Sequence, residues 1–202
     1  MYQAKIFRDG EGDEWFERNK HTNLNHNVVD AILDLSVKPS SMLEIGCGNG
    51  RYLGELHRYF GGRACGVDPS AKAIAEARKS YPDCRFRIET AAEAINYECR
   101  NTSHYDLVLF GFCLYLVDRE DLFYVIAGTD AILSDGGHIA VHDFDPLQPR
   151  KVPYKHKEGV FSYKMDYPAL WLANPAYRVV TRTPTNEGEA ITIICKRGWD
   201  SI

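Results

Sequence analysis

Three glycines at alternate positions, directly after a short apolar run, constrain the fold of this chain more than any other feature. Residues 41–45 form the apolar run, Gly46, Gly48 and Gly50 follow it, and residues 52–60 have the periodicity of a helix. Glycine lets the backbone turn tightly and approach a ligand closely, while the first turn of a helix offers unpaired amide donors. This strand, turn and helix predict a site for a nucleotide-like cofactor.

The same alternation of strand and helix continues along the chain and predicts a parallel sheet with helices on both faces. The expected strands are residues 64–67, 84–88, 105–110 and 138–142, and the expected helices are residues 25–35, 69–80, 91–96 and 119–133, the last closed by Gly136 and Gly137. Residues 177–183 and 190–197 predict a terminal antiparallel hairpin. Residues 145–159 contain prolines and basic side chains without an apolar period, which predicts a long loop.

Size and charge narrow the class of protein further. With 202 residues, one domain over residues 1–202 is expected, and a net charge of -4 makes a nucleic-acid partner unlikely. The six cysteines include no Cys-x-x-Cys pair and are expected to be reduced thiols, and no apolar run is long enough to span a membrane. We therefore expect a cytoplasmic protein with no membrane partner and assign no metal site; the oligomeric state and the need for a metal, for which Asp143 and Asp145 are the candidate ligands, are left open.

Two classes of cofactor compete for the glycine turn. Dinucleotide sites require Gly-x-Gly-x-x-Gly, but here the third glycine comes one residue early and Arg51 occupies the expected place. The segment from Glu44 to Gly50 instead resembles the Glu/Asp-x-Gly-x-Gly-x-Gly signature of class I S-adenosylmethionine-dependent methyltransferases. The resemblance implies a Rossmann-like α/β fold, with a seven-stranded, mostly parallel sheet whose last strand is antiparallel, and S-adenosylmethionine as cofactor.

The resemblance extends over about half of the chain and implies the cofactor contacts. Asp68 ends the second strand, where a carboxylate accepts hydrogen bonds from both ribose hydroxyls, and Pro69 would pack on the adenine. The other implied cofactor residues are Glu44, Gly46, Cys47 and Gly48 around the glycine turn, and Thr90, Ala91 and Ala92 at the adenine edge. Phe110 and Gly111 would lie beneath the methionine moiety, and Arg18 would pair with the cofactor carboxylate. As alternatives, the glycines form a plain turn, Asp68 is a helix cap and Arg18 is merely solvated.

Methyl transfer is an in-line displacement, so holding the acceptor suffices for an amine, whereas a neutral alcohol also has to lose a proton. His142 and Asp143 end the fifth strand, and Tyr115 follows the fourth, so these three are the candidate catalytic residues. The alternative interpretation is that His142 and Tyr115 are core residues and that Asp143 caps the following loop.

Two segments outside the repeating pattern complete the prediction. Residues 1–37 are expected to form a helical cap over the cofactor, and residues 145–176, rich in basic and aromatic side chains, a loop or lid for the substrate. The expected activity is transfer of a methyl group to an oxygen or nitrogen of a small molecule such as a metabolite, sugar or natural product. A nicotinamide-dependent oxidoreductase and a non-catalytic S-adenosylmethionine-binding regulatory subunit are the alternatives.

Overall fold

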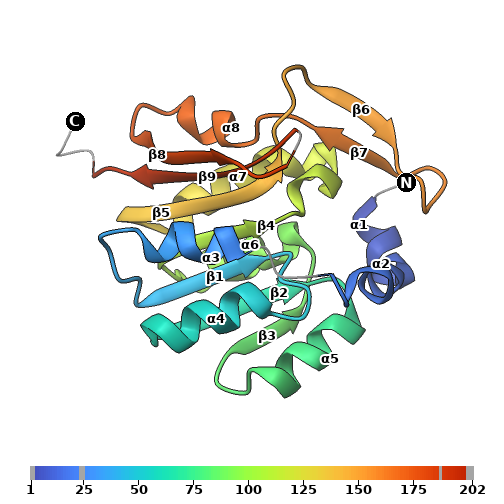
Figure 1. Cartoon of the computed structure of the whole chain (residues 1–202), viewed down its shortest axis with the longest axis horizontal. Coiled ribbons are helices and arrows are strands. Elements are labelled where there is room, and N and C mark those ends of the chain that lie inside the picture. The colour runs from blue at the N-terminus through green and yellow to red at the C-terminus, as the bar shows by residue number, and fades with distance from the viewer. Residues whose placement is uncertain (1–2, 23–25, 187, 199–202) are drawn as a thin grey trace.

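A seven-stranded sheet forms the centre of the molecule (Figure 1). The computed structural model describes residues 3–22, 26–186 and 188–198. The strands are β1 (Ser41–Ile45), β2 (Arg63–Asp68), β3 (Arg85–Ile88), β4 (Tyr105–Gly111), β5 (Leu133–Phe144), β8 (Tyr177–Pro184) and β9 (Glu189–Lys196), in the order β3-β2-β1-β4-β5-β9-β8. Strands β1 to β5 are parallel, and β9 is antiparallel to both β5 and β8. The predicted sheet with its antiparallel last strand is confirmed.

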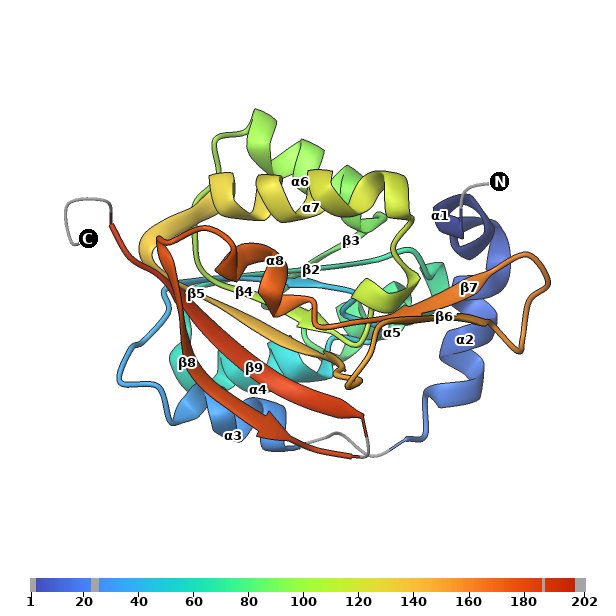
Figure 2. The same cartoon turned by 90° about the horizontal axis from the view of Figure 1, so that it is seen from above.

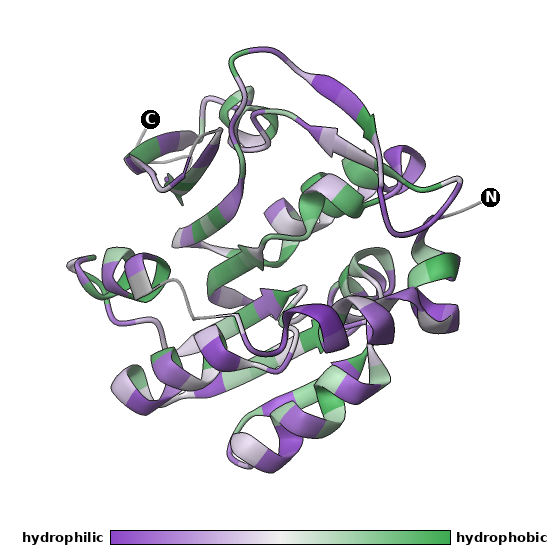
Figure 3. Ribbon diagram, turned by 45° about the vertical axis from the view of Figure 1, so that its right-hand side comes forward, coloured by the Kyte–Doolittle hydropathy of each residue, from purple (hydrophilic) through white to green (hydrophobic). Residues whose placement is uncertain are grey.

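Helices cover both faces of this sheet, as Figure 2 shows from above. One face packs against α3 (His26–Leu33), α4 (Arg51–Phe60) and α5 (Ala71–Ser80), and the other against α6 (Ala91–Arg100), α7 (Arg119–Ile132) and α8 (Pro168–Leu172). Apolar and polar residues alternate along these helices (Figure 3), because one side of each helix packs on the sheet and the other meets water. The predicted helix 25–35 corresponds to α3, although Asn25 lies outside the described residues.

The first helices bridge the two sides of the carboxyl edge of the sheet. They are α1 (Gln3–Ile6), the π-helical turn η1 (Phe7–Glu11) and α2 (Gly12–Asn19). On one side, the backbone amides of Gln3 and Ala4 each donate to the Asp118 carboxylate at 2.9 Å. On the other side, Asp13 accepts a 2.6 Å hydrogen bond from the Ser70 hydroxyl at the start of α5. These contacts tie α1 and α2 to the sheet domain on both sides of its carboxyl edge, whereas α3, also within the predicted cap 1–37, packs on a face of the sheet.

The structure corrects two local predictions. Residues 145–159 are not a loop throughout, because β6 (Arg150–Pro153) pairs with β7 (Phe161–Lys164) in an antiparallel two-stranded ribbon, here called the β6–β7 ribbon. Gly136 and Gly137 do not separate a helix from a strand, because β5 begins at Leu133, directly after α7. In the described part of the chain, no helix combines the length and apolar character needed to cross a bilayer.

Candidate functional site

A cleft lies at the carboxyl ends of β1, β2 and β4, under the N-terminal helices. It contains about 820 Å³ of space outside protein atoms, part of it open to solvent. Such a cleft at the carboxyl edge of a parallel sheet is where this fold class binds ligands. The lining residues come from the sheet edge (Ile45, Gly46, Asp68, Pro69, Glu89, Thr90, Ala91, Ala92, Gly111, Phe112, Cys113), from the N-terminal helices (Ala4, Phe7, Gly12, Trp15) and from the segment entering α7 (Leu116, Val117, Asp118, Asp121).

The glycine turn has the close approaches that the sequence predicts. Gly46 has a φ of 74°, and a Cβ atom there would lie 2.4 Å from the Cys113 Cβ. Gly50, at a φ of 75°, packs against the Phe86 ring, which a Cβ would meet at 2.7 Å. Both positions require glycine on two grounds, the left-handed backbone and the lack of space. Of the turn residues predicted to bind cofactor, Gly46 lines the cleft, whereas Cys47 is buried in the core and Gly48 is not among the lining residues.

Asp68 lies at the end of β2 and faces the cleft. One carboxylate oxygen accepts from the Gly48 amide at 2.9 Å, and the other accepts from the Ser70 amide at 2.8 Å. Burial raises the pKa of Asp68 to about 6, against the effect of these two amides. Asp68 thus holds the glycine turn and the start of α5 together, and its remaining lone pairs are available to hydroxyl donors in the cleft.

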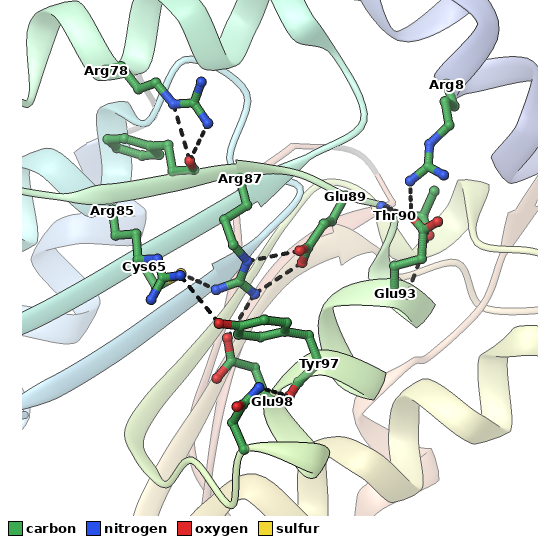
Figure 4. Close-up of polar contacts among 12 residues, drawn as sticks. Arg8, Cys65, Arg78, Arg85, Arg87, Glu89, Thr90, Glu93, Tyr97 and Glu98 are labelled. Atoms are coloured by element: carbon green, nitrogen blue, oxygen red, sulfur yellow. Dashed lines mark hydrogen bonds and ion pairs between the residues drawn. The ribbon is translucent and has the colours of Figure 1, made fainter.

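The segment after β3 presents free amides to the cleft. Thr90 and Glu93 form a capping box at the start of α6, in which each engages the other's backbone amide. The amides of Ala91 and Ala92, which both line the cleft, donate to no described residue. Glu89 also lines the cleft, and Arg87 binds its carboxylate with two hydrogen bonds of 3.0 Å (Figure 4). This edge therefore combines amide donors with a fixed carboxylate, a pattern that suits a nucleobase.

The floor of the cleft is formed by the end of β4. Gly111 lines the cleft, but Phe110 points the other way, because side chains alternate along a strand, and its fully buried ring packs 5.5 Å from that of Trp171. Glu44 lies directly behind Gly111. Its Oε2 accepts from the Leu53 amide at 3.1 Å, while its Oε1 is buried without a hydrogen-bond partner among the described residues. An unpaired buried carboxylate oxygen next to the cleft favours a cationic or hydrogen-bonding ligand group there.

The three candidate catalytic residues lie behind the cleft wall. His142 is buried against Phe112, with ring centroids 5.2 Å apart, and neither of its ring nitrogens has a partner among the described residues. Burial lowers the pKa of His142, so its ring is neutral near pH 7. Tyr115 is buried between Phe112 and Phe144. The Asp143 carboxylate accepts from the amides of Leu114, Tyr115 and Phe144, so it caps the segment after β4 rather than the loop that follows β5.

Arg18 does not line the cleft. Its guanidinium forms an ion pair with the buried Glu11 and a 3.1 Å hydrogen bond with the Tyr154 hydroxyl. Sequence reasoning missed a different group of lining residues, those that enter α7 (Leu116, Val117, Asp118 and Asp121). The helical periodicity of α7 is the only local sequence signal near these four residues. They line a cleft because the N-terminal helices fold back onto the segment that leads into α7.

Cysteine and metal chemistry add little to this site. No three His, Cys, Asp or Glu residues of the described ranges are grouped closely enough to hold a metal ion. Cys113 lines the cleft, but burial raises the pKa of its thiol well above the usual value. A neutral thiol is a poor nucleophile, so Cys113 is a wall residue.

Comparison with known proteins identifies related sequences. Residues 42–137 match a family model described as a methyltransferase domain. A trans-aconitate 2-methyltransferase of Escherichia fergusonii is 34% identical over 112 residues, covering 54% of this chain and 41% of that protein. The serine/threonine-protein acetyltransferase YopJ of Yersinia pseudotuberculosis is 27% identical over 172 residues, covering 70% of this chain and 57% of that protein. The chain thus spans about half the length of the curated relatives it matches.

A solved structure has the same fold over nearly the whole chain. It is the 1,6-didemethyltoxoflavin-N1-methyltransferase of Burkholderia thailandensis, with bound 1,6-didemethyltoxoflavin and S-adenosylhomocysteine. Its TM-score is 0.73 at 18% identity, and the match covers 96% of this chain and 89% of that chain. This similarity agrees with the Rossmann-like architecture seen in the strand order.

Proposed function

Because the chain belongs to the class I S-adenosylmethionine-dependent methyltransferases, we propose that it transfers a methyl group from S-adenosylmethionine to an oxygen or nitrogen of a small molecule. The family that the glycine turn resembles is thereby confirmed. The observation that carries the proposal is the cleft itself, where the glycine turn and Asp68 meet under the N-terminal cap.

The residues of the cleft fit this cofactor in three places. Asp68 has free lone pairs for the ribose hydroxyls, and Pro69 next to it provides an apolar surface for the adenine. The amides of Ala91 and Ala92, which have no partner among the described residues, would donate to the adenine edge. The unpaired Oε1 of Glu44 lies behind Gly111, where it favours the ammonium of the methionine moiety.

In the reaction, the cofactor supplies an electrophilic methyl group whose bond to sulfur breaks as the bond to the acceptor atom forms. The protein orients the acceptor, excludes water and receives a proton where the acceptor is neutral. Phe112 and Trp15 line the cleft and give it apolar walls. We keep the neutral His142 ring, which contacts Phe112 and whose nitrogens have no partner among the described residues, as the candidate proton acceptor. We assign Tyr115 and Asp143 to the support of the cleft wall.

Support for a small acceptor comes from the similar proteins and from charge. Two of them carry the names of small acceptors, trans-aconitate and 1,6-didemethyltoxoflavin. The net charge of -4 does not favour a phosphate backbone as partner.

The first test is binding of S-adenosylhomocysteine, measured by titration calorimetry. We expect saturable binding to the wild-type chain and at least tenfold weaker binding to Asp68→Ala, because two ribose hydroxyls lose a charged acceptor. Asp83→Ala, away from the cleft, is the matched control. Absence of heat with the wild-type protein, or equal affinity in the Asp68 variant, would overturn the cofactor assignment.

The second test is activity. Methyl-labelled S-adenosylmethionine with pools of carboxylates, phosphates, sugars and amines should label one class of acceptor. If the cofactor binds but no acceptor is labelled until a second protein is added, the result supports the regulatory-subunit alternative. If NAD, and not S-adenosylmethionine, raises the melting temperature, the result supports the oxidoreductase alternative, because a ligand stabilises the folded state only if it binds that state.

A further inference from the structure

Three aromatic rings form a wall where β4 and β5 end. Phe112 lies 5.3 Å from Tyr115 and 4.9 Å from Phe144, and the latter two rings are 5.1 Å apart, all measured between centroids. Phe112 also lines the cofactor cleft. In this aromatic wall (Phe112, Tyr115 and Phe144), Phe112 is the ring that an acceptor in the cleft would meet, while the buried Tyr115 and the ring of Phe144 pack against it.

Two cations at one end of the β6–β7 ribbon lie beside the aromatic wall. Lys164, the last residue of β7, places its Nζ 3.6 Å from the centre of the Phe144 ring. Arg150, the first residue of β6, is directly opposite Lys164 in the ribbon. Like charges in directly opposite positions destabilise a strand pair. Neither side chain forms a hydrogen bond or ion pair with any residue that the structure describes.

The carboxylates around these two cations are already engaged elsewhere. Asp145 and Asp166 both form ion pairs with Arg182. Asp143 accepts three backbone amides, and Glu189 accepts a 2.8 Å hydrogen bond from Asn186. Burial and the charge of Arg150 lower the pKa of Lys164, although Glu189 and Asp143 act in the opposite direction. Among the described residues, the Arg150–Lys164 pair thus has no close anionic partner.

Charge is distributed unevenly between the cleft and the ribbon. Asp68, Asp118 and Asp121 line the cleft, which suits the positive sulfonium and ammonium groups of the cofactor. The Arg150–Lys164 pair supplies the opposite sign at Phe144, whose ring contacts that of Phe112. A ligand that bridges the two regions would meet an apolar aromatic surface followed by two unpaired cations.

We propose that the methyl acceptor is an anion whose carboxylate or phosphate group binds the Arg150–Lys164 pair while the rest of the acceptor packs on the aromatic wall. This proposal rests on the proposed methyl transfer and adds the chemical class of the acceptor. It explains why two like charges are placed opposite each other beside the aromatic rings.

The test uses the full chain saturated with S-adenosylhomocysteine and two probes, citrate for carboxylates and inorganic phosphate for phosphates. Binding is followed by NMR chemical-shift titration up to about 50 mM. We expect saturable binding of at least one probe, about tenfold weaker in Lys164→Gln and in Arg150→Gln, because each loses a charge-assisted contact. Lys164→Arg, which keeps the charge, should retain most of the affinity. Lys157→Gln, at the exposed far end of the ribbon, is the matched control and should bind like the wild type.

Which probe binds distinguishes the two anion classes. The proposal is overturned if neither probe binds, if both charge-removing variants bind as tightly as the wild type, or if Lys157→Gln weakens binding equally. Binding of S-adenosylhomocysteine is measured first in each variant. If the wild-type protein does not bind S-adenosylhomocysteine, the cofactor assignment is refuted. If it binds S-adenosylhomocysteine but neither anion, only the proposed class of acceptor is refuted.

Discussion

Two carboxylates at the cleft fix the local backbone and still have oxygen lone pairs free for a ligand. The Asp68 carboxylate accepts from the Gly48 and Ser70 amides and still faces the cleft. Glu44 shows the same combination, with one oxygen fixed by the Leu53 amide and the other unpaired. In both residues, burial raises the pKa, so their ionisation depends on the ligand that they meet.

The pKa of about 6 for Asp68 predicts how cofactor binding depends on pH. Ribose hydroxyls donate more strongly to the ionised carboxylate, so affinity for S-adenosylhomocysteine should be constant above pH 7 and fall as the pH drops through 6. At pH 5, one unit below this pKa, the loss should be about tenfold. Calorimetry from pH 5 to 8 measures it. Asp68→Asn, which cannot ionise, should bind weakly with a flatter profile; an equally steep profile in that variant would assign the effect to another group.

At the scale of secondary structure, the end of β5 fixes the segment that follows β4. Asp143 accepts from the Leu114 and Tyr115 amides of the short helix η2 (Leu114–Leu116). Phe112 just before it has a φ of 56°, an uncommon conformation for a bulky residue, and its amide donates to the His142 carbonyl at 2.8 Å. These contacts place Phe112 in the aromatic wall and on the cleft at once.

Removal of this support should be costly to stability. In Asp143→Ala, three amides lose their carboxylate acceptor, so we expect the free energy of unfolding to fall by about 2–4 kcal/mol. Asp143→Asn keeps one oxygen acceptor and should lose less. Urea unfolding of both variants gives the two values. A change below about 1 kcal/mol in the alanine variant would show that water replaces the carboxylate at little cost.

The sequence predicted elements whose pattern is local and missed those fixed by distant contacts. The glycine turn and Asp68 were predictable, because residue spacing alone dictates a tight turn after a strand. Strand β6 was missed because all its residues are exposed and it lacks apolar alternation; only pairing with β7 makes it a strand. The alternation along β4 turns the Phe110 side chain toward Trp171, so only its backbone carbonyl remains a predicted contact for the methionine moiety. No local pattern reports the positive φ of Phe112.

At the scale of the whole molecule, the N-terminal helices and the β6–β7 ribbon together close the carboxyl edge of the sheet. Figure 2 shows the ribbon beside α1 and α2. Gln3 joins the two parts, since its Nε2 donates to the Leu116 carbonyl at 3.0 Å and its Oε1 accepts from the Phe161 amide at 2.7 Å. The cleft and the aromatic wall therefore share one cover built from segments far apart in the sequence.

This shared cover predicts that Gln3 acts on cofactor binding without lining the cleft. Gln3→Ala removes both hydrogen bonds, so amides of α1 and η1 should exchange with deuterium about tenfold faster. Affinity for S-adenosylhomocysteine should fall about three- to tenfold, because part of the binding free energy would then be used to order the cap. Lys5→Ala, on the exposed side of α1, is the matched control for both measurements. Faster exchange with unchanged affinity would show that the cap closes over the cleft without contributing to cofactor binding.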